Sequence, residues 1–225
     1  MGLKQLYIGL FTEGITDEAF LSSVVERTFA KIIREETNVD IEICLFTIKI
    51  DKSGLNFKEQ VLEASKMGLA EYGISILCVH TDADDTTATQ SYTTKINPAK
   101  VALTTANPQM YCNIMVAIVP IQEMEAWLLA DKLLLKEEIG TDESDNQLGI
   151  HKHPEKISNP KEVIESAIRI DRQSLTKKRR RELKIADLYL PIGQQISLEK
   201  LMELQSFQDF QHNIREALKE LNLLY

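Results

Sequence analysis

The chain has 225 residues, of which 44% are hydrophobic and 27% charged, a composition that excludes wholesale disorder. Its 26 basic residues against 34 acidic ones give a formal net charge of −8, so positive charge alone cannot drive nucleic-acid binding. The apolar runs are far shorter than the ~18 residues that span a bilayer, and we expect no membrane partner.

Strand and helix signals alternate along the first part of the chain, as hydrophobic periodicity and turn residues show. In chain order, the expected elements are a strand over Leu6–Thr12, a helix capped by Thr16, a strand over Ile41–Ile50, a helix over Phe57–Tyr72 that ends at Gly73, a strand over Ile74–His80, a helix over 88–106 interrupted at Pro98, a strand over Asn113–Val119 and a helix over Met124–Leu135.

This order predicts an α/β fold with a mostly parallel four-stranded sheet flanked by helices. Residues 1–136 are expected to form the α/β core. Residues 137–225 read as a loop followed by helices, and we expect them to form a C-terminal helical extension packed on the core. Three cysteines lie far apart in apolar surroundings, and the N-terminus has no signal-peptide pattern, which together predict a cytoplasmic protein with free thiols.

Acidic residues follow three of the four predicted strands, at the point where each strand ends. The carboxyl ends of parallel strands lie at one edge of a sheet, where open α/β folds bind ligands. No lysine or arginine lies within these motifs, so a hard divalent cation is the expected counter-charge. Removing one carboxylate should then leave the metal-free protein no less stable. The acidic residues are Glu13 and Asp17 after the first strand, Asp82, Asp84 and Asp85 after the third, and Glu123 and Glu125 after the fourth.

Each acidic motif also has a purely structural explanation. Asp17 suits the positive end of a helix dipole, and Asp-x-Asp at a strand end is common in solvated turns. Glu123 and Glu125 would fit exposed helix positions. Because all three motifs fall at the same edge of the predicted sheet, we favour one shared site over three unrelated structural roles.

These motifs and their surroundings resemble Toprim-type domains, and most closely the DUF4276 group, which is related to the Toprim nucleases of the OLD family. The resemblance is carried by Thr12-Glu13-Gly14-Ile15-Thr16-Asp17-Glu18, Asp82-Ala83-Asp84 and Glu125-Ala126-Trp127-Leu128-Leu129-Ala130-Asp131, with further similarity over His153–Ile157, Asn159–Glu162 and Ser206–Phe210.

The resemblance implies a Toprim-like fold, one or two Mg²⁺ (or Mn²⁺) ions, and hydrolysis of phosphodiester bonds in a nucleic-acid substrate. It implies catalytic roles for Glu13, Asp82 and Asp84, and a metal-binding set that also includes Asp17 and Glu125. It further suggests an effector of anti-phage defence that works with an ATPase partner. Relatives often have glycine where this chain has Asp85, a change that could alter the turn or add a ligand.

Metal-dependent cleavage needs carboxylates to hold the ions and no nucleophilic side chain. Topoisomerases of the Toprim class use a separate tyrosine domain, which a chain of this length does not supply, so we favour a nuclease. The one dense basic run has a solvated helix face as its ordinary explanation and a nucleic-acid contact as its functional one. The candidate nucleic-acid-binding residues are Lys177, Lys178, Arg179, Arg180 and Arg181.

Two other functions fit part of the sequence. Asp82 to Thr86 match the Asp-x-Asp-x-Thr signature of haloacid-dehalogenase-type phosphatases, in which Asp82 would be the nucleophile and Asp84 the general acid. That signature normally opens the fold on the first strand, and here it follows the third. The other alternative is a catalytically degenerate Toprim-like domain that docks to or senses an ATPase. The sequence does not specify DNA or RNA, the number of ions or the oligomeric state.

Overall fold

The computed structural model of the chain describes residues 4–174 and 183–224. Four strands form one all-parallel sheet in the order β2-β1-β3-β4. They are β1 (Lys4–Phe11), β2 (Ile41–Thr47), β3 (Ile76–His80) and β4 (Met115–Ile118), close to the predicted segments. The predicted α/β fold class, with a parallel sheet and C-terminal helices, is therefore confirmed.

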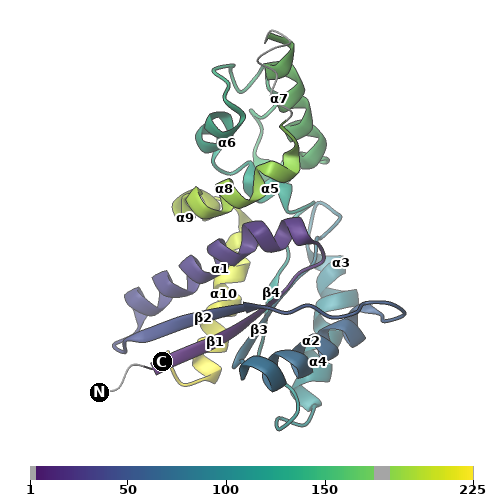
Figure 1. Cartoon of the computed structure of the whole chain (residues 1–225), viewed down its shortest axis with the longest axis vertical. Helices are drawn as coiled ribbons and strands as arrows, with labels where there is room; N and C mark the ends of the chain where they lie inside the picture. Colours follow the sequence, from purple (N-terminus) through teal and green to yellow (C-terminus); the bar gives the residue numbers. More distant parts are fainter. Residues whose placement is uncertain (1–3, 175–182, 225) are drawn as a thin grey trace.

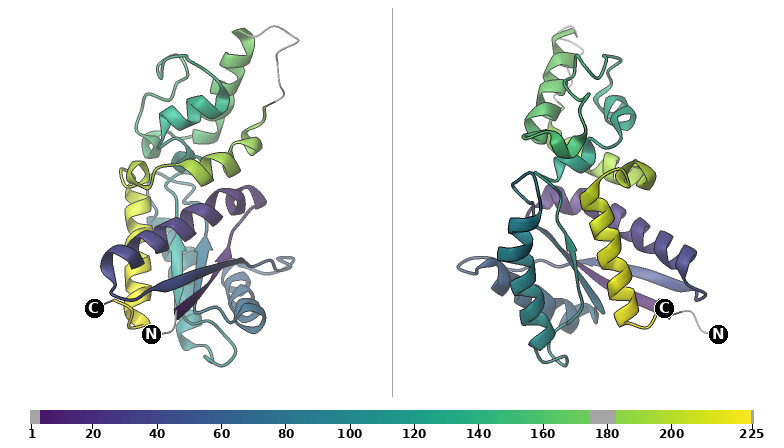
Figure 2. Two further views of the ribbon diagram at one scale, coloured as in Figure 1. Left: turned by 60° about the vertical axis from the view of Figure 1, so that its left-hand side comes forward. Right: turned by 180° about the vertical axis from the view of Figure 1, so that it is seen from behind.

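Helices cover both faces of this sheet (Figures 1 and 2). On one face lie α1 (Ile15–Glu36) and α10 (Gln205–Glu220), and on the other α2 (Phe57–Tyr72) and α4 (Asn97–Thr105). Alternate residues of a strand point to opposite faces. Cys78 accordingly packs in the core that includes α1, whereas its neighbours Leu77 and Val79 pack in the core that includes α2.

Helix α1 begins earlier than expected. Its N-cap is Gly14 and not Thr16, because the carboxylate of Asp17 accepts a hydrogen bond from the Gly14 N–H at 2.9 Å. Asp17 thus caps the helix from its first turn, as acidic residues often do. Helix α2 ends as predicted, with Gly73 in the left-handed conformation at φ 64°.

The segment after β3 contains a widened turn. Short helix α3 (Thr89–Ser91) leads into a π-helical turn, η1 (Tyr92–Ile96), in which the Asn97 N–H bonds to the Tyr92 carbonyl. Pro98 follows in the first turn of α4 and has no N–H to donate, which accounts for the break in the regular helical ladder. The interruption predicted at Pro98 is therefore present and takes the form of a π turn.

The helix expected over Met124–Leu135 is two helices, α5 (Glu125–Leu128) and α6 (Lys132–Ile139). Asp131 separates them because its carboxylate accepts a hydrogen bond from the Leu134 N–H at 3.2 Å and so caps a new helix.

We call the described part of residues 132–201 the cap. It forms a lobe beyond α1 in Figure 1. Besides α6, its elements are η2 (Pro154–Lys156), α7 (Pro160–Ser174), η3 (Ile185–Asp187), α8 (Tyr189–Gln195) and α9 (Leu198–Leu201). Arg27 of α1 ties the cap to the core, since its guanidinium donates to the carbonyls of Gly193 and Ile196, both at 2.8 Å.

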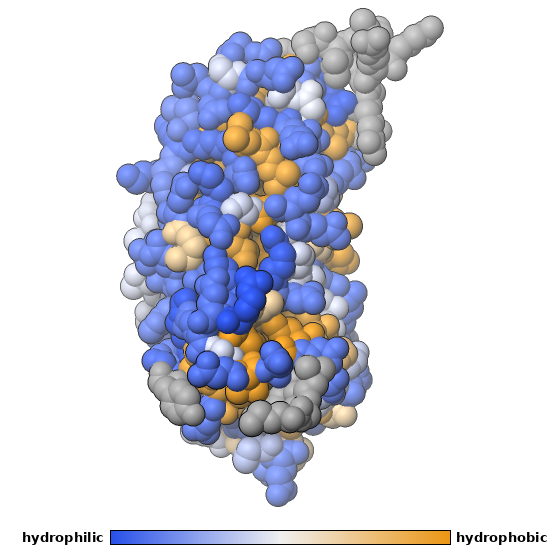
Figure 3. Space-filling model, turned by 90° about the vertical axis from the view of Figure 1, so that its left-hand side faces the viewer, coloured by the Kyte–Doolittle hydropathy of each residue, from blue (hydrophilic) through white to orange (hydrophobic). Residues whose placement is uncertain are grey.

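Helix α10 leaves the cap and returns to the sheet, where it packs against β4. The Asn213 side chain donates to the carbonyl of Ala117 at 3.2 Å. Figure 3 shows hydrophilic side chains over most of one side of the molecule, with apolar areas in both its upper and its lower half. Among the described residues, no helix is long and apolar enough to cross a membrane.

Three motifs singled out in the sequence meet where α10 begins. Trp127 is fully buried, with its ring edge-on to Phe207 at 5.2 Å, and its indole N–H donates to the Ser206 hydroxyl at 2.8 Å. The Glu155 carboxylate accepts from the backbone N–H groups of Gln205 and Ser206 at 3.0 and 2.9 Å, and from the Ser206 hydroxyl at 2.6 Å. Glu155 therefore caps α10 across a gap of 50 residues in the chain.

Replacing Glu155 with alanine is expected to lower the free energy of unfolding by about 1–3 kcal/mol. The change removes the hydrogen bonds that satisfy the first N–H groups of α10 and the favourable interaction of the carboxylate with the helix dipole. It also leaves the Ser206 hydroxyl without an acceptor. Urea denaturation of the two proteins measures the difference. Glu203→Ala is the control, because the Glu203 side chain is 61% exposed and, within the described part of the chain, its carboxylate pairs with Lys200 alone. Equal losses in the two variants would contradict the capping role.

Candidate active site

The predicted acidic residues lie at the ends of three neighbouring strands, β1, β3 and β4. Beyond the last ladder residues, the loops after β3 and β4 continue to pair. The Ala83 N–H donates to the Pro120 carbonyl at 3.0 Å, the Asp84 N–H to Gln122 at 2.9 Å, and the Gln122 N–H back to Asp85 at 3.0 Å. These bonds hold the Asp-x-Asp segment against the loop that carries Glu123 and leads into α5, which begins at Glu125.

Two residues in this loop pair have left-handed backbone conformations, Asp84 at φ 53° and Gln122 at φ 65°. Non-glycine residues seldom adopt them outside functional or tightly held segments. Asp85 is not among the described residues with positive φ, so the turn does not require the glycine that relatives have there. The Asp85 carboxylate instead accepts from the Thr86 N–H at 2.6 Å.

His80 lies between two of the carboxylates. Its ring is completely buried, with Nδ1 3.7 Å from Asp17 and Nε2 3.4 Å from Asp82. Neither contact has hydrogen-bond geometry, so both ring nitrogens and Oδ1 of Asp82 are buried without a hydrogen-bond partner. His80 is therefore a core histidine and at the same time a close neighbour of two carboxylates.

The pKa values of this group reflect crowding and burial. Burial raises the pKa of Asp17, the charge of His80 partly offsets this, and the charges of Asp82 and Glu13 raise it further. Burial alone lowers the pKa of His80, but its interaction with Asp82 and the charges of Asp17 and Glu13 outweigh that effect and raise it. His80 therefore holds its proton more readily than a free histidine, and its positive charge offsets part of the negative charge of Asp17 and Asp82.

A second basic group faces Glu13. The Thr81 hydroxyl donates to Glu13 Oε1 at 2.6 Å and accepts from the Lys95 ammonium at 2.8 Å. Lys95 comes from the π turn η1 and also lies 3.6 Å from Glu13 and 4.0 Å from Asp84. The expectation that only a metal ion balances the carboxylates was therefore incomplete, because the π turn brings a lysine from outside the acidic motifs.

The two glutamates after β4 are held by the cap. Glu125 is 5% exposed and accepts a hydrogen bond from the Tyr189 hydroxyl at 2.6 Å. Burial, this hydrogen bond and the charges of Glu125, Asp17 and Asp82 raise the pKa of Tyr189. Burial and the charges of Glu125 and Asp82 raise the pKa of Glu123, against a hydrogen bond from the Lys161 N–H at the start of α7. All five predicted metal-site residues therefore belong to one electrostatic network.

The carboxylate oxygens suit a hard cation, although the described side chains are not arranged around a common point as the ligands of a bound ion would be. In the described part of the chain, no group of three or more His, Cys, Asp or Glu side chains has the spacing of a metal site. Carboxylate oxygens are nevertheless the ligands that Mg²⁺ and Mn²⁺ favour. Oδ1 of Asp82, which lies 3.4 Å from Nε2 of His80, and Oε2 of Glu123 are buried without a hydrogen-bond partner, and a bound cation would compensate them.

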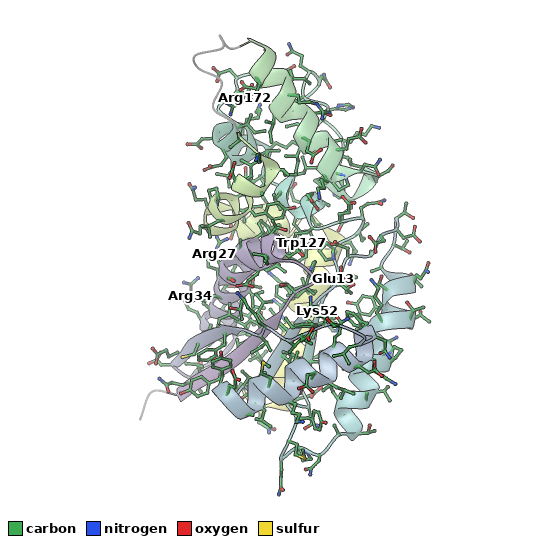
Figure 4. The ribbon with its side chains drawn as sticks, turned by 45° about the vertical axis from the view of Figure 1, so that its right-hand side comes forward. Glu13, Arg27, Arg34, Lys52, Trp127 and Arg172 are labelled. Carbon is green, nitrogen blue, oxygen red and sulfur yellow. The ribbon has the colours of Figure 1, made fainter. Side chains whose placement is uncertain are left out.

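A cavity of about 240 Å³ opens beside Glu13, between the β1–α1 turn and the segment after β2. Two lysines, Lys49 and Lys52, line it. The Lys52 ammonium donates to the backbone carbonyls of Thr12 and Glu13 at 2.8 and 2.9 Å. Figure 4 shows the labelled side chains of Glu13 and Lys52 close together. A larger cavity, about 490 Å³, lies in the cap and is lined by no predicted site residue.

A family model described as "Domain of unknown function (DUF4276)" matches residues 12–215, which include every predicted site residue. The chain belongs to the DUF4276 family. Neither a curated protein nor a solved structure matches it. The DUF4276 match runs from the β1–α1 turn into α10, so it takes in the cap and strands β2, β3 and β4, and begins just after β1.

Sequence reasoning missed three members of the network in this DUF4276 chain. Thr81 stands next to Asp82 and could have been found from that position alone. Lys95 and Tyr189 could not, because their places depend on a π turn and on the packing of the cap. The predicted nucleic-acid-binding residues Lys177, Lys178, Arg179, Arg180 and Arg181 lie outside the described residues and stay a prediction.

Proposed function

We propose that this protein is a divalent-metal-dependent phosphodiesterase that cleaves nucleic acid, a nuclease of the Toprim type. The observation that carries the proposal is the convergence of carboxylates from three adjacent strand ends on one partly buried site with unpaired oxygens. In that site Glu13, Asp17, Asp82, Asp84 and Glu125 would hold Mg²⁺ or Mn²⁺. The bound cation would supply an activated water and stabilise the leaving oxygen.

The surrounding residues have separable tasks. Thr81 orients Glu13 through its hydroxyl, and Tyr189 orients Glu125. His80 lies between Asp17 and Asp82 and would offset part of their negative charge. Lys49 and Lys52 beside Glu13 provide positive charge where the phosphate backbone of a substrate would lie. From the family resemblance we also propose a nucleic-acid substrate, an ATPase partner and a role in defence against phage.

The direct test is cleavage of DNA and RNA, each single- and double-stranded, with Mg²⁺, with Mn²⁺ and with EDTA. We expect cleavage that requires the metal and stops on chelation. Cleavage that persists in EDTA would contradict the proposed mechanism. The test is repeated with the proposed ATPase partner added, because an effector of that kind can need its partner.

A second function has support from one observation. His80 and Lys95 already balance several of the carboxylates, as would be expected of a Toprim-like domain that docks to or senses an ATPase without catalysis. Binding to the ATPase without any metal-dependent cleavage would favour this alternative. Trapping of a phosphoaspartate at Asp82 would instead favour the phosphatase.

A further inference from the structure

Lys95 occupies a particular place in the acidic cluster. Its ammonium group lies 2.8 Å from the Thr81 hydroxyl, 3.6 Å from Oε1 of Glu13 and 4.0 Å from Oδ2 of Asp84. These oxygens come from the ends of β1 and β3, and the π turn after β3 delivers the lysine to them. A π turn inside a helix is rare and is often found at functional sites.

We propose that Lys95 is the internal counter-ion of the metal-free site, and that a divalent cation must displace its ammonium group in order to bind Glu13 and Asp84. This inference rests on the proposed function, because those two carboxylates are among its proposed metal ligands. A hard cation binds carboxylate oxygens at about 2.0–2.6 Å. An ammonium group that stayed on the same oxygens would repel it strongly at such a short distance.

Of the two basic residues in the cluster, only Lys95 is free to leave. His80 is the last residue of β3 and its side chain is completely buried. The Lys95 side chain is 31% exposed and has a flexible four-carbon stem. Its other neighbour is the Phe57 ring, with the ammonium 6.0 Å from the ring centre. The ammonium group can therefore turn toward solvent, or toward a bound phosphate, while His80 keeps holding Asp17 and Asp82.

This competition has two measurable consequences. Removing the lysine charge should strengthen metal binding, because the cation no longer has to displace it. Removing the charge should also lower the melting temperature without metal, because Glu13 and Asp84 lose their neutralising partner. A residue with only a structural role would lower the melting temperature without strengthening metal binding.

The experiment is titration of the metal-free protein with MnCl₂ by calorimetry, with the thermal melting of each variant followed alongside. Lys95→Met is expected to bind Mn²⁺ at least about fivefold more tightly than the wild type, and to show a larger rise in melting temperature on adding Mn²⁺. Lys95→Arg keeps the charge and should bind as weakly as the wild type. Lys100→Met, at an exposed position on α4, controls for net charge and should change the affinity less than about twofold.

The outcomes separate this inference from the proposed function. Equal Mn²⁺ affinity of wild type and Lys95→Met would overturn the displacement of Lys95 and leave the metal site standing. Weaker binding by Lys95→Met would also overturn it, since Lys95 would then support the bound state. No binding by either protein would overturn both proposals. Should Lys95→Met not fold, Lys95→Gln replaces it, because glutamine is neutral but retains a donor for Thr81.

Discussion

Replacing Asp84 with asparagine is expected to reduce metal-dependent cleavage at least about 100-fold, which corresponds to about 2.7 kcal/mol in the activation free energy. The free energy of unfolding should change by less than about 0.5 kcal/mol. The side chain is 71% exposed, so its charge contributes little to stability. Asparagine also tolerates the left-handed backbone that Asp84 adopts at φ 53°. Initial cleavage rates and urea denaturation measure the two effects.

Asp85→Asn is the matched control for this variant. It removes the same charge from the next residue of the same exposed loop, and an asparagine oxygen can still accept the hydrogen bond from Thr86. We expect cleavage within about twofold of the wild type, because Asp85 is held by its own turn and faces none of the cluster's basic groups in the contacts described. Equal activity of the two variants would remove Asp84 from the proposed metal site.

Asp84 is a better test than Asp82, and the structure explains why. From the sequence alone, losing any carboxylate relieves repulsion and should not destabilise the metal-free protein. The structure places Asp82 3.4 Å from Nε2 of a buried His80 whose pKa is raised. Neutralising Asp82 would remove one of the two carboxylates that lie closest to that ring. A loss of activity there could then follow from a local rearrangement as well as from a missing ligand.

The arrangement of the strand ends was predictable because it depends on local pattern. The continuous apolar run that ends at His80 indicates a strand buried on both faces, and the acidic residues follow at once. Parallel topology then sends the ends of β1, β3 and β4 to the same edge without any knowledge of side-chain contacts. The placement of Glu13 and the Asp-x-Asp segment at one edge of the sheet thus follows from the predicted parallel topology, whereas the strand order β2-β1-β3-β4 was not predicted.

The remainder of the site depends on interactions that sequence pattern does not record. Lys95 sits in a polar stretch typical of a solvated helix, and only the break before Pro98 turns it toward Glu13. Tyr189 reaches Glu125 from α8, and this contact exists because α8 packs tightly on α1. Helix starts were also misjudged where an acidic side chain capped the backbone first, as Asp17 does at Gly14.

The close packing of α8 on α1 leaves no room for a side chain at Gly193. Gly193→Ala is expected to lower the free energy of unfolding by about 2–3 kcal/mol. A Cβ at this position would lie 2.6 Å from the carbonyl oxygen of Phe20 and 2.7 Å from its Cα. Both are backbone atoms of α1, so no rotamer change can relieve the clash and the two helices must separate. Separation would also strain the contacts of Arg27 with the Gly193 and Ile196 carbonyls.

Gly68→Ala provides the comparison that isolates this cause. Gly68 is likewise a buried glycine within a helix, so both variants gain the same helix propensity, about 1 kcal/mol. Its added Cβ would meet Cδ1 of Ile74 at 2.5 Å, the far end of a side chain that can change rotamer. We therefore expect a net change below about 1 kcal/mol for Gly68→Ala. Urea denaturation showing equal losses for the two variants would mean that α8 can shift on α1. The cap could then not hold Tyr189 against Glu125 as rigidly as the structure indicates.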